Sequence, residues 1–242
     1  MLPLKQDAPP INIERCIKIL SEKFRKWPYN FFTESDAHSY LYYSFFRYGN
    51  RAIKITYPSK NPIERTVLIH REYPTFFRYS QKALERRYAL CEAFGTCGHY
   101  DMVVLNPSFV ENHEIQAVIS KDNRIRQTIK YEDFHLLAAI EFKLLHKPLG
   151  QALKDEIKKD FVKLSWALET RQARDAYMLI FNRYDSEKTY WKELEGLEAT
   201  YPRVRLIYQE SYYRDRDHKT FIRSHLNRTP AANAIGAGSS GS

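Results

Sequence analysis

The second half of the chain alternates short apolar runs with longer amphipathic stretches, and this order limits the folds open to it. The runs GHYDMVVLNP, LLAAIEFKLL, DAYMLIFNR and RVRLIYQE have the length and composition of buried strands. Stretches with helical spacing of apolar residues, 149–168 and 186–199, separate the last three runs, and Lys154, Lys158 and Lys163 are expected on the polar side of the first stretch. The order strand, strand, helix, strand, helix, strand predicts an α/β fold with a mixed central sheet flanked by helices.

The N-terminal part of the chain is predicted to form two helices. Apolar residues recur at helical spacing after Asn12, a suitable N-cap, and this pattern stops at Pro28. A second helix follows, because Thr33 and Asp36 have the spacing of a capping box and Gly49 is well placed to end the helix.

Three further segments complete the chain between these helices and the strand that contains Glu141. Apolar and polar residues alternate over 52–58 and 62–74, which predicts a hairpin-like pair. Residues 79–94 return to helical spacing. The long polar stretch 106–133 needs some structure of its own or a functional reason for its length.

A length of 242 residues allows one sizeable domain. We expect this domain at 1–228, with a helical part at 11–49, a core at about 52–210 and a flexible tail at 229–242. The first residues lack the apolar core of a signal peptide, and no apolar run is long enough to cross a bilayer. Three cysteines match no common disulfide framework. We therefore expect a soluble, cytoplasmic protein with reduced thiols and no membrane partner.

The formal net charge of +9, together with 18 tyrosines, suits a polyanionic partner such as nucleic acid. A role of this charge in solubility is the alternative. Neither GxGxxG nor GxxxxGK occurs, which weighs against a nucleotide-dependent enzyme. The absence of GxSxG and HExxH lowers the ordinary hydrolase and zinc-protease interpretations.

Two opposite charges interrupt the apolar run at 136–145. Glu141 and Lys143 are two residues apart, so in a strand both side chains point to one face. The simplest explanation is a solvated strand face with an intra-strand ion pair. A functional site is the alternative, and it depends on which other residues lie nearby.

The segments GHYDMVVL and AIEFK resemble the PD-(D/E)xK nuclease superfamily, over about residues 52–210. In this resemblance Asp101 matches the aspartate of the motif, Glu141 and Lys143 match its ExK, and Tyr100 replaces the usual proline. The resemblance implies a restriction-endonuclease-like fold and a Mg²⁺-dependent nuclease, with Mn²⁺ as a substitute ion. Its substrate would be DNA rather than RNA, in defence, recombination or repair.

Phosphodiester hydrolysis gives each of these residues a role. Asp101 and Glu141 would hold a hard cation, and the backbone carbonyl of Phe142 could supply a third oxygen. Lys143 would orient or deprotonate the attacking water, or stabilise the charge that develops on the phosphate.

Three further residues are candidates for an accessory role. Glu34 would supply a carboxylate from an upstream helix, although a carboxylate in a first helical turn is also stabilised by the helix dipole. Glu72, at the end of the predicted hairpin, is the alternative to Glu34 as the accessory carboxylate. If it has no such role, we expect it to be a solvated charge at the end of a strand. Gln151 begins the helix after ExK and could contact a metal-bound water or a phosphate.

Basic residues interleaved with tyrosines are candidates for nucleic-acid contact, and each is otherwise a solvated surface charge: Arg78, Arg86, Arg87, Lys121, Arg124, Arg126, Arg214 and Arg216. Two other functions stay open. One is a nucleic-acid-binding or assembly protein that keeps the nuclease fold without cleavage, and the other is an α/β domain that binds another protein. A homodimer is compatible with cleavage of two strands, but the sequence identifies no interface.

Overall fold

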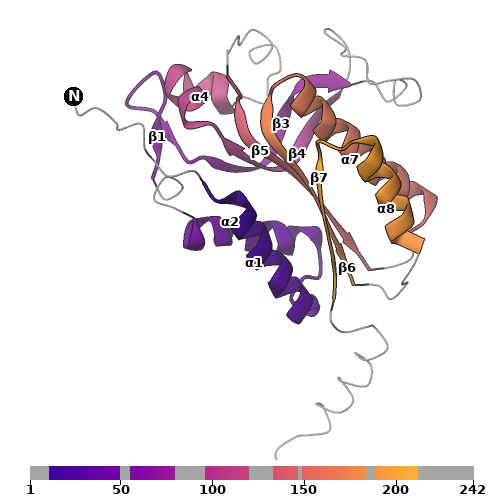
Figure 1. Ribbon diagram of the computed structural model, residues 1–242. Helices are drawn as coiled ribbons and strands as arrows, with labels where there is room; N and C mark the ends of the chain where they lie inside the picture. Colours follow the sequence, from indigo (N-terminus) through magenta and orange to yellow (C-terminus); the bar gives the residue numbers. More distant parts are fainter. Residues whose placement is uncertain are drawn as a thin grey trace, which may run out of the picture.

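A five-stranded sheet lies between two helical layers in the computed structural model (Figure 1). The structure describes residues 11–49, 55–79, 96–119, 133–146, 149–183 and 189–211. The strands, in spatial order, are β3 (Ile69–Tyr79), β4 (Thr96–Leu105), β5 (Leu136–Leu145), β6 (Ala173–Asn182) and β7 (Arg205–Glu210). The main helices are α1 (Ile13–Lys26), α2 (Glu34–Tyr48), α7 (Gln151–Glu169) and α8 (Thr189–Thr200).

The sheet is mixed, as the order of elements predicts. Strand β4 is antiparallel to both of its neighbours, β3 and β5, whereas β5, β6 and β7 are parallel. Parallel neighbours need a crossover connection, and α7 and α8 provide the two that this sheet requires. The helices α1 and α2 cover the opposite face (Figure 1). The α/β fold with a mixed sheet flanked by helices is therefore confirmed.

Both N-terminal helices begin and end where their capping residues predict. The side chain of Asn12 accepts a hydrogen bond from the Arg15 N–H at 2.9 Å, and α1 ends before Pro28, where the short 3₁₀ helix η1 (Pro28–Asn30) begins. The Asp36 carboxylate accepts a hydrogen bond from the Thr33 N–H at 2.9 Å and completes a capping box. Gly49 is the C-cap of α2.

The predicted hairpin forms, but among the described residues it is short. Strands β1 (Tyr57–Pro58) and β2 (Arg65–Thr66) pair as two-residue antiparallel strands, and residues 52–54 of the prediction lie outside the described ranges. The chain after them enters the main sheet as β3, where Leu68 and Ile69 are buried. A two-stranded hairpin cannot bury such side chains by itself, so pairing with β4 is favoured.

The predicted helix at 79–94 lies outside the described residues, apart from Tyr79, which ends β3. The first part of the polar stretch 106–133 does have structure of its own, namely α4 (Pro107–Asn112) and α5 (Ile115–Ile119). Residues 120–132 and the tail at 229–242 lie beyond the described ranges.

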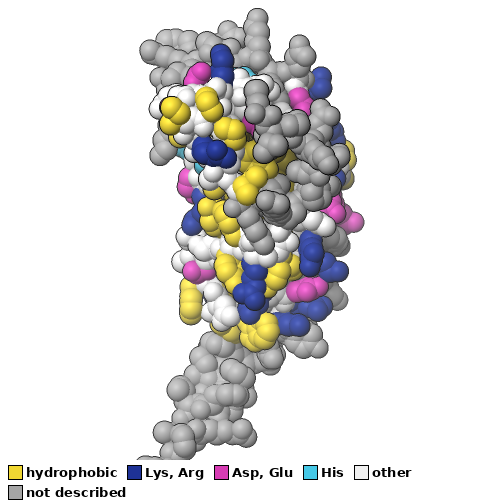
Figure 2. Space-filling model, turned by 90° about the vertical axis from the view of Figure 1, so that its left-hand side faces the viewer, with side chains coloured by type: hydrophobic (Ala, Val, Ile, Leu, Met, Phe, Trp, Pro, Cys, Tyr) yellow, Lys and Arg dark blue, Asp and Glu magenta, His cyan; other side chains and the backbone are white. Residues whose placement is uncertain are grey.

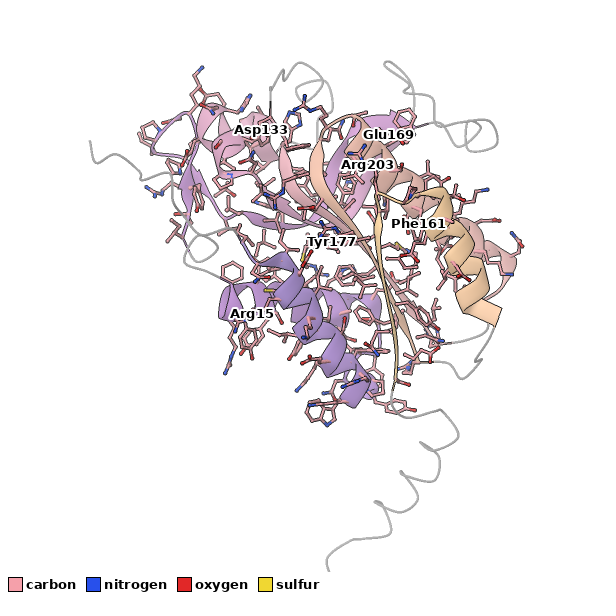
Figure 3. All side chains as sticks on the ribbon, viewed as in Figure 1. Arg15, Asp133, Phe161, Glu169, Tyr177 and Arg203 are labelled. Atoms are coloured by element: carbon pink, nitrogen blue, oxygen red, sulfur yellow. The ribbon has the colours of Figure 1, made fainter. Side chains whose placement is uncertain are left out.

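The core fills both spaces between the sheet and the helices. The predicted apolar stripe of α7 packs on the sheet through Ile157, Phe161, Leu164 and Leu168, and Phe161 is labelled in Figure 3. Cys16 is a free thiol buried in the α1 layer, as expected of a reduced cysteine. Among the described helices, none combines the length and the apolarity that crossing a membrane would require.

Candidate active site

Strands β4 and β5 separate next to the residues that carry the PD-(D/E)xK resemblance. Their ladder runs to the pair Met102 and Ile140, although both strands continue past it. The next position on each strand is Asp101 and Glu141. Continuing the antiparallel register places these two carboxylates opposite each other, one on each strand.

Side-chain carboxylates bind the β5 backbone where the strands separate. The N–H of Phe142 donates to Asp101 Oδ2 at 2.7 Å, and the N–H of Leu144 donates to Glu34 Oε1 at 3.2 Å. Buried backbone donors need a partner, and two carboxylates fill the places that carbonyl groups of β4 would otherwise take. This arrangement draws Glu34 to β5 from a position 110 residues earlier in the chain.

Glu34, the first residue of α2, therefore lies at the predicted site. Burial raises the pKa of its carboxyl group, and the nearby Lys143 opposes this shift. Asp101 and Asp160 raise the pKa of Glu34 further. Stabilisation by the helix dipole would not require a contact of this first-turn carboxylate with β5, so the hydrogen bond from Leu144 is compatible with the accessory role.

Glu141 and Lys143 each pair with a residue of α7. Lys163 Nζ lies 2.7 Å from Glu141 Oε1, and Lys143 Nζ lies 2.8 Å from Asp160 Oδ2. Asp160 Oδ1 is also 3.1 Å from Lys163 Nζ. The explanation as a solvated intra-strand pair is therefore wrong, because both charges are buried against a helix and pair crosswise with it.

Lys163 corrects a second expectation from the sequence, which groups it with Lys154 and Lys158 on the polar side of α7. Only 12% of its side chain is exposed, and it donates to the His99 carbonyl of β4 at 2.8 Å. Its position borders the buried stripe that includes Leu164, so the edge of that stripe reaches β5. Helical spacing predicts the centre of a buried face more reliably than its edges.

Burial and charge act in opposite directions on these groups. Burial raises the pKa of Glu141 well above its usual range, and Lys163 counteracts part of this rise. Burial would lower the pKa values of Lys143 and Lys163, but their carboxylate partners outweigh it, so both pKa values are raised. Both lysines are therefore ammonium ions at neutral pH.

His38 is a buried neighbour of the cluster that the sequence did not reveal. Its ring lies 4.4 Å from the Phe142 ring, and Nε2 is 3.8 Å from Asp101 Oδ2, which is too long for a hydrogen bond. Burial lowers the pKa of His38, with Asp101 opposing the shift. The available signal was its spacing of four residues from Glu34, which places both on one face of α2.

We call this group of six ionisable residues the acidic cluster: Glu34, Asp101, Glu141, Lys143, Asp160 and Lys163. Four carboxylates and two ammonium groups leave two negative charges when all are ionised. Within the described ranges no three His, Cys, Asp or Glu residues converge as a metal-binding group. However, Mg²⁺ commonly binds only one or two protein carboxylates, so the oxygen donors and the excess negative charge fit it.

The other predicted site residues are placed as follows. Glu72 is exposed in β3, where its φ of 50° is in the left-handed region. Gln151 is exposed and donates to Asp155 Oδ1 at 2.9 Å in its own helix. Arg78 belongs to β3 by its backbone, but its side chain is outside the described part. The remaining predicted contacts with nucleic acid also lie outside it: Arg86, Arg87, Lys121, Arg124, Arg126, Arg214 and Arg216.

A second charged network joins α1 to the sheet on the opposite face. Arg205 of β7 binds Glu14 of α1, and it donates to Asp175 Oδ1 and Tyr177 Oη, both at 3.2 Å. These residues line a pocket of about 270 Å³, near the label of Tyr177 in Figure 3. Burial raises the pKa of Tyr177 to about 12. Arg174 also pairs with Asp175 at 2.9 Å, so two guanidinium groups neutralise two carboxylates, and we interpret this network as structural.

No family model, curated protein or solved structure matches the chain. The chemistry of the acidic cluster therefore has to be inferred from its own residues and their geometry.

Proposed function

We propose that the protein is a divalent-metal-dependent nuclease that hydrolyses phosphodiester bonds of DNA, with a restriction-endonuclease-like fold of the PD-(D/E)xK superfamily. One observation carries this proposal: the separation of β4 and β5 brings Asp101, Glu34 and the ExK residues of β5 together. If β5 had only a structural role in the core, its N–H groups would bind carbonyl groups of β4 rather than the carboxylates of Asp101 and Glu34.

Asp101 and Glu141 would hold Mg²⁺ or Mn²⁺, together with the carbonyl oxygen of Phe142. In an antiparallel ladder the N–H and C=O of one residue point to the same side. Since the Phe142 N–H faces Asp101, its carbonyl is directed to the same gap. The cation would neutralise the phosphate and promote ionisation of the attacking water.

Lys143 is better suited to stabilise charge on the phosphate than to remove a proton. Its pKa is raised by Asp160, Glu34 and Asp101, so it stays protonated at neutral pH. An ammonium group held in a buried site can stabilise the negative charge that develops in the transition state. Of the roles expected for Lys143, general base is therefore the least suitable.

Asp160 and Lys163 are positioning residues in this proposal. They lie three residues apart on α7, where Asp160 holds Lys143 and Lys163 holds Glu141. The helix thus fixes both ExK side chains, and a reacting group must be held to within a fraction of an ångström. Lys163 also neutralises Glu141, whose buried charge would otherwise be costly.

Cleavage assays test the proposal with Asp101→Asn and the matched variant Asp175→Asn, which removes a carboxylate from the structural network of β6. We would incubate supercoiled, linear and single-stranded DNA, and RNA, with Mg²⁺, with Mn²⁺ and with EDTA. We expect metal-dependent cleavage that Asp101→Asn reduces by roughly 100-fold or more and Asp175→Asn preserves. Equal cleavage by Asp101→Asn and wild type would refute the site. Binding of nucleic acid without cleavage by the wild type would favour the non-catalytic alternative.

A further inference from the structure

A continuous row of aromatic rings and cations runs over the outer surface of α1 and α2. We call it the aromatic–basic row, and it consists of Lys26, Trp27, Lys23, Tyr40, Tyr43, Arg47 and Tyr48. Figure 2 shows the face on which the α1 and α2 layer lies in its lower half, where hydrophobic and Lys or Arg side chains are interspersed. None of these residues belongs to the acidic cluster.

The row begins at the C-terminal end of α1. Lys23 Nζ lies 4.1 Å from the centroid of the Trp27 ring, and Lys26 Nζ lies 6.0 Å from the same centroid. Lys23 Nζ is also 6.0 Å from the Tyr40 ring of α2. Lys23 therefore links the rings of the two helices.

The row continues along α2. The centroids of Tyr40 and Tyr43 are 6.3 Å apart, and the guanidinium carbon of Arg47 lies 5.8 Å from the Tyr43 ring and 5.6 Å from the Tyr48 ring. Residues 40, 43 and 47 have the spacing of one helical face, while the face with Leu41 and Phe45 is buried. Tyr43 is exposed on this outer face, where a surface helix usually has polar residues, and Tyr40 and Tyr48 are half-buried beside it.

The exposure of two rings and the charges beside them indicate which kind of ligand this surface would bind. Trp27 and Tyr43 are 51% and 47% exposed, so large ring areas are open for stacking. The acidic residues of α2, Glu34 and Asp36, are both in its first turn, so Arg47 has no Asp or Glu beside it within residues 37–48. Open rings beside cations are complementary to bases linked by phosphates.

The row also leads toward the acidic cluster. Tyr29 and exposed Phe32 follow Trp27 in the chain, and the guanidinium of Arg183 lies 5.6 Å from the Tyr29 ring. Arg183 donates to the Phe31 carbonyl at 3.0 Å, so this cation is held beside the start of α2. Glu34, which binds β5, is only two residues after Phe32.

We propose that the aromatic–basic row binds single-stranded nucleic acid and directs it to the acidic cluster. Bases would stack on Trp27 and Tyr43, and Lys23, Lys26 and Arg47 would neutralise phosphates. Stacking on protein rings requires bases whose faces are open, which a duplex does not offer. The second half of this proposal rests on the proposed nuclease function, whereas binding by the row does not.

Equilibrium binding in EDTA tests the row without cleavage. We would measure fluorescence anisotropy of a labelled DNA strand, an RNA strand and a DNA duplex of the same sequence at several salt concentrations. The variants Trp27→Ala and Tyr43→Ala each remove an exposed ring, and Arg47→Gln removes a cation. Their controls are Ile63→Ala, at a side chain that is 88% exposed, and Lys158→Gln, on the exposed side of α7. Thermal melting would verify that every variant is folded.

We expect the wild type to prefer single strands, and Trp27→Ala to weaken this binding roughly 5- to 100-fold. Arg47→Gln should reduce the dependence of binding on salt, because one phosphate contact is lost. The two controls should bind as the wild type does. Comparison of the DNA and RNA strands then decides which of them is bound more tightly.

Three outcomes would overturn the inference: equal single-strand affinity of Trp27→Ala and Ile63→Ala, tighter binding of the duplex, or binding of anionic vesicles with no affinity for the oligonucleotides. The binding assay of the row and the cleavage assay of the acidic cluster can fail independently of each other. Unaltered binding by Trp27→Ala together with lost cleavage by Asp101→Asn refutes the row alone. Weakened binding by Trp27→Ala together with full cleavage by Asp101→Asn refutes the nuclease site alone.

Discussion

The acidic cluster and the network around Arg205 contain similar ion pairs in opposite environments. In each, one basic side chain, Lys163 or Arg205, pairs with two carboxylates and joins a helix to the sheet. In the cluster, the side chains of Lys163 and Glu141 are 12% and 2% exposed, whereas in the network those of Arg205 and Glu14 are 48% and 68% exposed. Solvent therefore screens the second network but is largely excluded from the first.

This difference in solvent exposure indicates that the two groups of ion pairs have different roles. An exposed pair contributes about 0–1 kcal/mol to the free energy of unfolding. A buried pair gains little over apolar residues of the same size, because desolvation offsets its attraction. Stability alone would favour apolar side chains where β5 meets α7. Charges at this place are consistent with the proposed nuclease site, where the reaction would require them.

The largest expected effect is on catalysis. Glu141→Gln keeps the size of the side chain but removes the charge that would hold the cation, so cleavage should fall by roughly 100- to 1,000-fold. The measurement is the single-turnover rate on DNA with Mg²⁺, beside Glu14→Gln as a control in the exposed network. Similar rates for the two variants would show that the buried charge has no catalytic role.

The next effect is on stability. Lys163→Met leaves Glu141 buried without its ammonium partner, which should lower the free energy of unfolding by about 3–5 kcal/mol. Adding Glu141→Gln should recover more than half of this loss, because the unpaired charge is then removed. Urea unfolding of the two single variants and the double variant gives the coupling. Strictly additive losses would contradict a direct interaction of Glu141 with Lys163.

A smaller effect concerns pH and His38. Its folded pKa lies below its ordinary value, so on acidification the unfolded chain takes up the proton first and folding stability falls as the pH drops below about 6.5. His38→Gln lacks this proton, so its stability relative to the wild type should improve between pH 7.5 and pH 5.5. Urea unfolding in EDTA measures the change, with exposed His146→Gln as a control. An equal response of the two variants would mean that His38 is not the group responsible.

The smallest effect is expected in the exposed network. Arg205→Gln should change the free energy of unfolding by no more than about 1 kcal/mol, because solvent already screens its pairs with Glu14 and Asp175. Cleavage should be unaffected. A loss as large as that of Lys163→Met in parallel urea titrations would show that exposure does not distinguish the two groups of charges.

Local patterns in the sequence were sufficient for most of the fold. The caps at Asn12 and Gly49 mark real ends of helices, because capping depends on neighbours in the chain. The second predicted hairpin segment was only partly placed, because most of it continues into β3, whose partner β4 lies further along the chain, at Thr96–Leu105. Alternation predicts that a strand forms, but it does not identify its partner.

The candidate site was predictable only in part, for a similar reason. Asp101, Glu141 and Lys143 lie on predicted strands, and their spacing is visible in the sequence. Asp160 and Lys163 become visible only when α7 is packed on β5, since lysines are common on any exposed helix. The aromatic–basic row was missed because its residues belong to two helices, which Lys23 and Tyr40 link in space but not in the sequence.

The crossed pairing between β5 and α7 also limits how this chain can change in evolution. A reversal of charge at position 141 would need a matching reversal at 163, and, because Lys163 also contacts Asp160, further changes at 160 and 143. One residue inserted between Asp160 and Lys163 would turn one partner by about 100° round the helix axis. The connection between β5 and α7 can therefore vary in length, whereas the three-residue spacing of Asp160 and Lys163 within α7 has to be kept for both ion pairs to form.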